Sequence, residues 1–225
     1  MDARESRLTV VSPDRSPGWP LLPRHDDVYI VYMTRRNTAQ AILLAAHELF
    51  DREGPTAVTM RRVAEAVGIT PMALYRHFPN RDALLKRISD DSFQTAASTW
   101  RSHRRRRDPV ARLLATQEDY LDYALQHPHL FDHAFSVQRD DARRFPEDFR
   151  ARRSPTLNVV ADLLAEGMRD GVWRDDDPWD VAMTLWAHAH GLIALYRAGR
   201  FSYDATRFRT FYLASIRRLL DGLKA

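Results

Sequence analysis

The chain has 225 residues, of which 44% are hydrophobic and 28% charged, with a formal net charge of +4 and no cysteine. This composition is ordinary for a globular protein and excludes wholesale disorder, a disulfide framework and thiolate metal sites. Because no apolar run reaches the ~18 residues of a membrane span and no signal-peptide core is present, we expect a cytoplasmic protein without a membrane partner.

The first 32 residues are rich in proline, arginine and aspartate and show no periodicity. Four of the twelve prolines fall between residues 1 and 30. We interpret residues 1–32 as a flexible extension, because such a composition buries too little apolar surface to fold. The alternative is that translation starts at Met33.

Residues 33–80 contain a longer helix and then two short amphipathic helices separated by a glycine turn. Thr59 is positioned to cap the first short helix and Gly68 to end it. Thr70 is positioned to cap the second, and Pro71 takes its first position, where a missing N–H does no harm. Two short helices joined by such a turn are typical of a helix-turn-helix, whose second helix enters the DNA major groove.

The second short helix has an outward side that is polar, basic and aromatic, while Leu74 and Phe78 face inward. Nine Lys or Arg and six Asp or Glu lie between residues 34 and 90, so this segment carries most of the positive net charge of the chain. A positive segment favours an anionic partner such as DNA. The candidate DNA-binding residues are Thr59, Arg61, Arg62, Thr70, Pro71, Met72, Ala73, Tyr75, Arg76, His77, Asn80 and Arg81. Those placed to meet base edges are Arg61, Thr70, Met72, Ala73 and Arg76. The alternative for any one of them is an ordinary surface or core side chain.

The segment TMRRVAEAVGITPMALYRHFPNRDALL, from Thr59 to Leu85, resembles the TetR family of bacterial transcriptional repressors. Its most distinctive part is the ALYRHF run followed by a basic residue at the next helix start. The resemblance implies that Tyr75, His77 and Arg81 touch DNA phosphates. It also implies a homodimer that binds a palindromic double-stranded DNA operator and is released by a small-molecule effector.

A second run, WAHAHG at residues 186–191, resembles the Trp-x-His-x-x-Gly pattern of one ligand-domain variant of the same family. Across residues 81–225 proline and glycine separate helical patterns that begin near Asn80, Asp108, Pro128, Pro146, Pro178 and Tyr203. Pro155 is a candidate break in the fourth of these helices. The expected fold is all-α with about nine helices: an N-terminal three-helix helix-turn-helix domain and a C-terminal helical bundle for effector binding and dimerisation.

Large apolar and aromatic side chains are frequent in the middle helices of the bundle. By the resemblance, the candidate ligand-binding residues are Trp100, Tyr120, Tyr123, Phe131, Phe135, Met168, Met183, Trp186 and His190. Such a stripe is more often core than pocket, so both interpretations stand.

The last two helices carry apolar stripes that could pair with those of a second subunit. The candidate interface residues are Tyr196, Phe208, Phe211, Tyr212, Ile216 and Leu219. Periodicity alone allows an intrachain core helix equally well, and the resemblance favours the dimer.

We expect no metal and no cofactor. His129 and His133 are spaced to hold one ion, but no cysteine or further ligand accompanies them. The chain has no phosphate-binding glycine loop, nucleophile elbow or His-Glu-x-x-His motif, so an enzyme is not expected. The leading hypothesis is a ligand-responsive repressor, and the alternative is a DNA-binding regulator controlled by a protein partner.

Overall fold

The computed structural model describes residues 35–103, 108–135 and 142–224. The N-terminal extension predicted for residues 1–32 lies outside these ranges. Within them every regular element is helical, and the only strand-like pairing is an isolated bridge between Trp173 and Lys224. The predicted all-α class is therefore confirmed.

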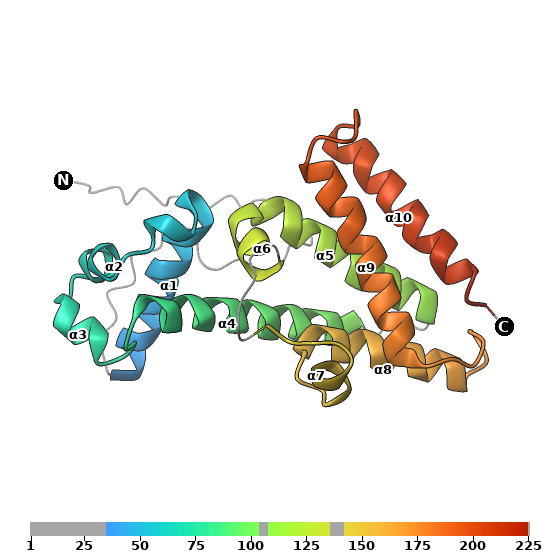
Figure 1. Ribbon diagram of the computed structural model, residues 1–225, viewed down its shortest axis with the longest axis horizontal. Coiled ribbons are helices and arrows are strands. Elements are labelled where there is room, and N and C mark those ends of the chain that lie inside the picture. The colour runs from blue at the N-terminus through green and yellow to red at the C-terminus, as the bar shows by residue number, and fades with distance from the viewer. Residues whose placement is uncertain (1–34, 104–107, 136–141, 225) are drawn as a thin grey trace, which may run out of the picture.

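A small N-terminal unit, here called the head, is formed by three α-helices and a 3-10 turn (Figure 1). Its elements are α1 (Arg35–Glu53), η1 (Pro55–Ala57), α2 (Met60–Val67) and α3 (Pro71–Tyr75). The bundle that follows holds the remaining helices. They are α4 (Arg81–Ser102), α5 (Pro109–Gln126), α6 (Pro128–Phe135), α7 (Glu147–Arg150), α8 (Pro155–Arg169), α9 (Pro178–Arg197) and α10 (Ala205–Asp221). None of the described helices combines the length and apolarity that a membrane span requires.

Ten α-helices occupy the described residues instead of the nine predicted, because the helix expected from Pro146 is divided. α7 ends at Arg150, and α8 restarts with Pro155 in its first turn, where proline fits. The Ser154 side chain caps α8 by accepting a hydrogen bond from the Leu157 N–H at 3.3 Å. Pro155 is thus the break that the sequence suggested.

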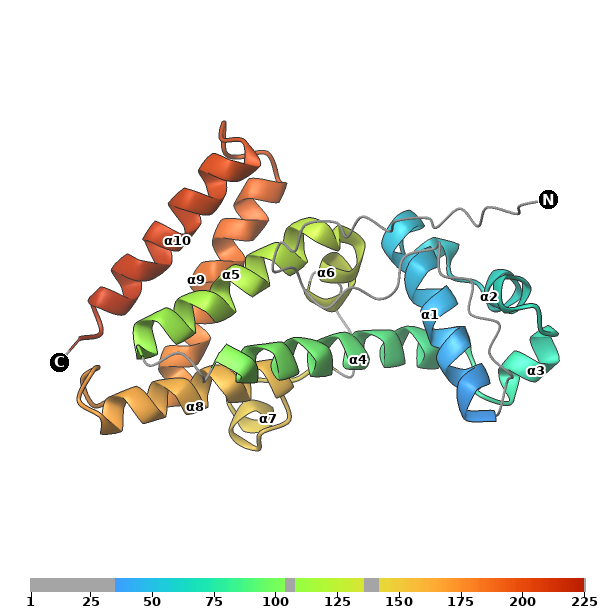
Figure 2. The same cartoon turned by 180° about the vertical axis from the view of Figure 1, so that it is seen from behind.

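The head and the bundle each have an apolar core, and two helices belong to both. On α4, Leu84 and Ile88 are buried in the head core, whereas Trp100 is buried in the bundle core. On α6, Leu130 lies in the head core and its neighbour Phe131 in the bundle core. Figures 1 and 2 show α4 running from the head into the bundle. The predicted boundary after residue 80 therefore marks the start of a shared helix.

α10 packs its apolar stripe against α5 and α9 of its own chain. Phe208, Tyr212 and Ile216 are fully buried, and the Tyr212 hydroxyl donates to the Gln117 carbonyl at 3.1 Å. The prediction that these three residues lie at a dimer interface is wrong, because burial inside the chain leaves them no free surface. The other three candidates, Tyr196, Phe211 and Leu219, are partly exposed, and their role in a dimer stays a prediction.

Candidate DNA-binding surface and ligand cavity

The helix-turn-helix is held by local hydrogen bonds at each helix start. The Thr59 hydroxyl accepts from the Arg62 N–H at 3.2 Å, and the Thr70 hydroxyl accepts from the Ala73 N–H at 3.2 Å. Gly68 ends α2 at φ 72°, a left-handed conformation that glycine adopts without a Cβ penalty. The caps predicted from the sequence are confirmed, as is the cap at Asn80, whose side chain accepts from Ala83 at 2.8 Å.

The face of α3 opposite Leu74 is presented to solvent. Leu74 is fully buried in the head core, whereas Met72 is 69% exposed and Tyr75 48% exposed. Arg76 is exposed on the same helix end, and His77 is half-buried. An exposed methionine and tyrosine on a rigid short helix are unusual for a surface that meets only water.

Two basic candidates are engaged with the head itself. The Arg62 guanidinium bonds the Glu53 carboxylate at 2.9 Å and the Ala57 carbonyl at 3.3 Å. Arg81 donates its Nε–H to the Val58 carbonyl at 2.7 Å and a second N–H to the Pro55 carbonyl. These contacts fix the loop before α2 against α1 and α4. Both side chains thus have a structural task, which sequence reasoning did not foresee.

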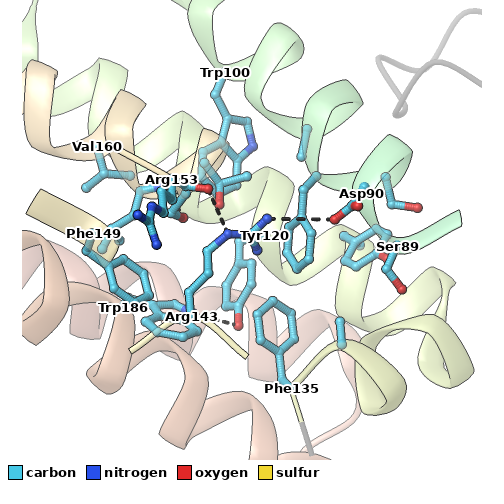
Figure 3. Close-up of a pocket in the computed structure, with 18 of the residues that line it drawn as sticks. Ser89, Asp90, Trp100, Tyr120, Phe135, Arg143, Phe149, Arg153, Val160 and Trp186 are labelled. Carbon is cyan, nitrogen blue, oxygen red and sulfur yellow. Dashed lines mark hydrogen bonds and ion pairs between the residues drawn. The ribbon is translucent and has the colours of Figure 1, made fainter. Parts of the chain in front are cut away.

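The bundle contains a cavity of about 510 Å³. α4, α5, α6, α8 and α9 contribute to its walls. The segment around α7, residues 142–154, adds Arg143, Phe149 and Arg153 (Figure 3). Five of the nine predicted ligand residues line it, namely Trp100, Tyr120, Tyr123, Phe135 and Trp186. A pocket of this size with aromatic walls is typical of small-molecule sites.

The other four predicted ligand residues do not line the cavity. His190 lies behind Tyr120, with its Nδ1 3.0 Å from the Tyr120 hydroxyl oxygen. Phe131 stacks on His190 with ring centroids 5.3 Å apart. Met168 and Met183 pack, partly buried, against the bundle core. Helical spacing identified all four as inward-facing, but it did not distinguish the cavity wall from the layer behind it.

A hydrogen-bond chain stiffens one wall of the cavity. Trp186 donates its Nε1–H to the Tyr120 hydroxyl oxygen at 3.0 Å, and an indole nitrogen can only donate. The Tyr120 proton is therefore free to go to His190 Nδ1 when the His190 ring is neutral and that nitrogen accepts. Burial raises the pKa of Tyr120 and lowers the pKa of His190, so both groups favour their neutral forms.

The charged side of the cavity was not predicted from the sequence. Arg143, Asp148 and Arg153 reach it from the segment around α7, and Asp90 reaches it from α4. Arginines and aspartates in a loop-rich region are usually solvated. Contacts between distant parts of the chain, such as the one that places Arg143 3.7 Å from Asp90, bring these groups to the cavity.

The histidines considered for metal binding lie where α6 meets the head. His127 Nδ1 is 2.9 Å from the Asp51 carboxylate, His129 lies against Gly54, and the His133 ring is 5.2 Å from the Phe50 ring. In the described part of the chain, no three His, Cys, Asp or Glu side chains are grouped to hold a metal ion. The cluster thus joins the head to the bundle.

A capped helix-turn-helix on a helical bundle with an internal cavity defines a DNA-binding regulator. Comparison with known families agrees: residues 42–88 match the bacterial regulatory proteins of the tetR family, and residues 113–221 match the tetracyclin repressor-like C-terminal domain. The chain belongs to the TetR family and is a transcriptional regulator of that family.

Several known proteins are similar over most of the chain. The nucleoid occlusion factor SlmA of Edwardsiella ictaluri is 26% identical over 183 residues, which cover 77% of this chain and 90% of the relative. A Rhodococcus sp. RHA1 protein of unknown function has a TM-score of 0.71 at 18% identity, covering 88% of this chain and 100% of its own. A TetR-family regulator from Pectobacterium atrosepticum has a TM-score of 0.66 at 18% identity, covering 86% and 98%. At these identities the structures show a shared fold.

Proposed function

We propose that the protein is a cytoplasmic repressor that binds a palindromic operator as a homodimer and is released when a small molecule enters the bundle cavity. The observation that carries this proposal is the continuity of α4. Its first turns pack in the head core through Leu84 and Ile88, and its later turns line the cavity through Phe93 and Trp100. A ligand that shifts the far part of α4 therefore moves the head.

The exposed face of α3 supports the DNA-reading half of the proposal. We assign base contacts to Arg61, Thr70, Met72, Ala73 and Arg76, and phosphate contacts to Tyr75 and His77. The helix starts at Thr59 and Asn80 offer backbone N–H groups to the phosphates. Arg62 and Arg81, which were expected to contact DNA directly, are assigned to positioning the head, because their guanidinium groups already bond its backbone and Glu53.

A homodimer fits the geometry that helix-turn-helix proteins require, since two heads read two half-sites about one turn of DNA apart or a multiple of it. Tyr196, Phe211 and Leu219 keep partly exposed apolar surface on α9 and α10. Leu195 on α9 is 49% exposed and was not expected from the sequence. We assign the dimer contact to the outer sides of these two helices.

The release mechanism is a population shift. In one arrangement of the dimer the two heads fit the operator, and in the other they do not. A saturating effector that binds the second arrangement more tightly lowers the affinity for the operator, at most by the ratio of the effector's affinities for the two arrangements. The test is a thermal-stabilisation screen of a compound library with the full chain, followed by addition of each stabilising compound to the operator complex. Release of DNA by a compound that raises the melting temperature supports the proposal.

A second candidate is a DNA-binding regulator that has no small-molecule effector and is controlled by a protein partner. It is favoured by the similarity to the nucleoid occlusion factor SlmA, whose name describes nucleoid occlusion and no response to a ligand. A screen in which no compound stabilises the protein or releases DNA favours this candidate over effector-controlled repression.

A further inference from the structure

The bundle cavity contains a buried hydrogen-bond donor that no described group satisfies. Trp100 is 6% exposed and lines the cavity, and its Nε1–H has no hydrogen-bond partner. An indole nitrogen donates and does not accept. Leaving such a donor unpaired in the interior costs on the order of 1–3 kcal/mol. Because the nitrogen itself is enclosed, a ligand acceptor reaches it only when the Trp100 ring turns toward the cavity.

Arg143 adds a charged donor to the same cavity. Its Nε–H donates to the Arg153 carbonyl at 2.7 Å (Figure 3). Its guanidinium lies over the Phe93 ring, 5.5 Å from the ring centroid. Its nearest carboxylate, Asp90, is 3.7 Å away, longer than a hydrogen bond. The guanidinium therefore keeps N–H donors available, and its side chain is only 31% exposed.

The other charged groups of the lining are already matched. Lys86 pairs with Asp90 at 2.8 Å, and Arg153 pairs with Asp148 at 2.7 Å. The lining as a whole contains three basic and two acidic residues. Asp90 therefore balances two cations, Lys86 at 2.8 Å and Arg143 at 3.7 Å, so one positive charge of the lining remains in excess and the cavity favours an anion over a cation.

We propose that the cavity binds an apolar monocarboxylic acid whose carboxylate bonds the Arg143 guanidinium. An acceptor atom of the same ligand takes the Trp100 Nε1–H, and the hydrocarbon part packs against Tyr120, Phe135 and Trp186. A carboxylate matches the planar guanidinium and forms charge-assisted bonds, which are about twice as strong as neutral ones. This inference rests on the proposed function in taking the cavity as the effector site.

The test compares each acid with the alcohol of the same carbon skeleton by calorimetric titration of the full chain. Octanoate is paired with octan-1-ol and 2-naphthoate with 2-naphthylmethanol, so the two pairs distinguish an aliphatic from an aromatic ligand. At least one acid is expected to bind ~10-fold more tightly than its alcohol, the ratio expected for one charge-assisted hydrogen bond.

Two variants locate the carboxylate and the donor. Arg143→Gln is expected to abolish the preference for acid over alcohol, and Trp100→Phe, which keeps an aromatic ring, to weaken acid binding about 5-fold through the lost donor. The matched control is Arg150→Gln, because Arg150 pairs with Asp177 and Asp180 and does not line the cavity. It is expected to bind acid like the wild type. Circular dichroism melting curves establish whether each variant is folded. If Trp100→Phe does not fold, the result for Arg143→Gln alone decides whether the carboxylate binds in the cavity.

Equal affinity for acid and alcohol in both pairs, no binding by either acid, or an unchanged preference in Arg143→Gln would overturn the inference. These outcomes are separate from failure of the proposed function. A neutral compound that binds the cavity and releases DNA refutes the acid ligand and leaves the ligand-responsive repressor in place. An acid that binds through Arg143 without altering DNA binding supports the ligand class and removes the regulatory role.

Discussion

Replacement of Tyr120 by phenylalanine tests the hydrogen-bond chain in the cavity wall. The substitution removes one oxygen that accepts from Trp186 Nε1 at 3.0 Å and bonds His190 Nδ1 at 3.0 Å, while the ring stays in place. Each net hydrogen bond contributes about 1 kcal/mol, so losing two costs about 2 kcal/mol. Because Trp186 and His190 are half-buried and water can reach part of them, we expect a loss of about 1–2 kcal/mol.

The measurement is urea unfolding followed by circular dichroism. The midpoint is expected to fall while the slope stays constant, because the exposed surface is unchanged. Tyr75→Phe is the matched control, since Tyr75 is 48% exposed on α3 and its hydroxyl makes no hydrogen bond with the described residues. An unfolding midpoint for Tyr120→Phe equal to that of the wild type would refute the proposed bonding chain.

Three further outcomes are expected. Gly167→Ala should lower the free energy of unfolding by about 3 kcal/mol or prevent folding, because the Cβ of the alanine would lie 2.0 Å from Cζ3 of the fully buried Trp173. A melting temperature within a degree of that of the wild type would contradict this packing. Gly68→Ala should cost about 1 kcal/mol from backbone strain at φ 72° alone, since no atom lies within 4 Å of the added methyl group, and chemical denaturation measures it. Because burial lowers the pKa of His190 below its ordinary 6.5, its contribution is complete above pH 6.5 and is lost as the pH falls through the lower folded pKa. His190→Gln should therefore flatten the decline in stability as the pH falls below about 7.5, and an unchanged slope would count against a neutral His190.

The parts of the fold that were predicted from the sequence depend on neighbouring residues. Thr59, Thr70 and Asn80 cap helices because their side chains reach N–H groups three residues ahead, and Gly68 ends α2 because of its own φ. Such interactions are encoded within a few positions. The helix-turn-helix could therefore be predicted from the sequence alone.

The features that could not be predicted depend on contacts far apart in the chain. The periodicity of α10 showed that Phe208 and Tyr212 are buried, but it did not show whether α5 of the same chain or a second subunit covers them. Arg143 reaches the cavity because it lies beside α4, near Asp90 and Phe93, which are more than 49 positions away in the sequence. The local sequence pattern does not predict such a contact.

The most direct test of the DNA-reading surface is selection of DNA fragments from the source genome by the purified full chain at low ionic strength. The wild type should enrich a common inverted repeat, with affinity that falls steeply as salt rises. Arg76→Ala should relax the preference at one position of each half-site, whereas Tyr75→Ala should weaken binding to all fragments about equally. Failure of the wild type to enrich any sequence would contradict the assignment of the α3 face to DNA. The same contradiction would follow if both variants selected the repeat of the wild type and bound it with the affinity of the wild type.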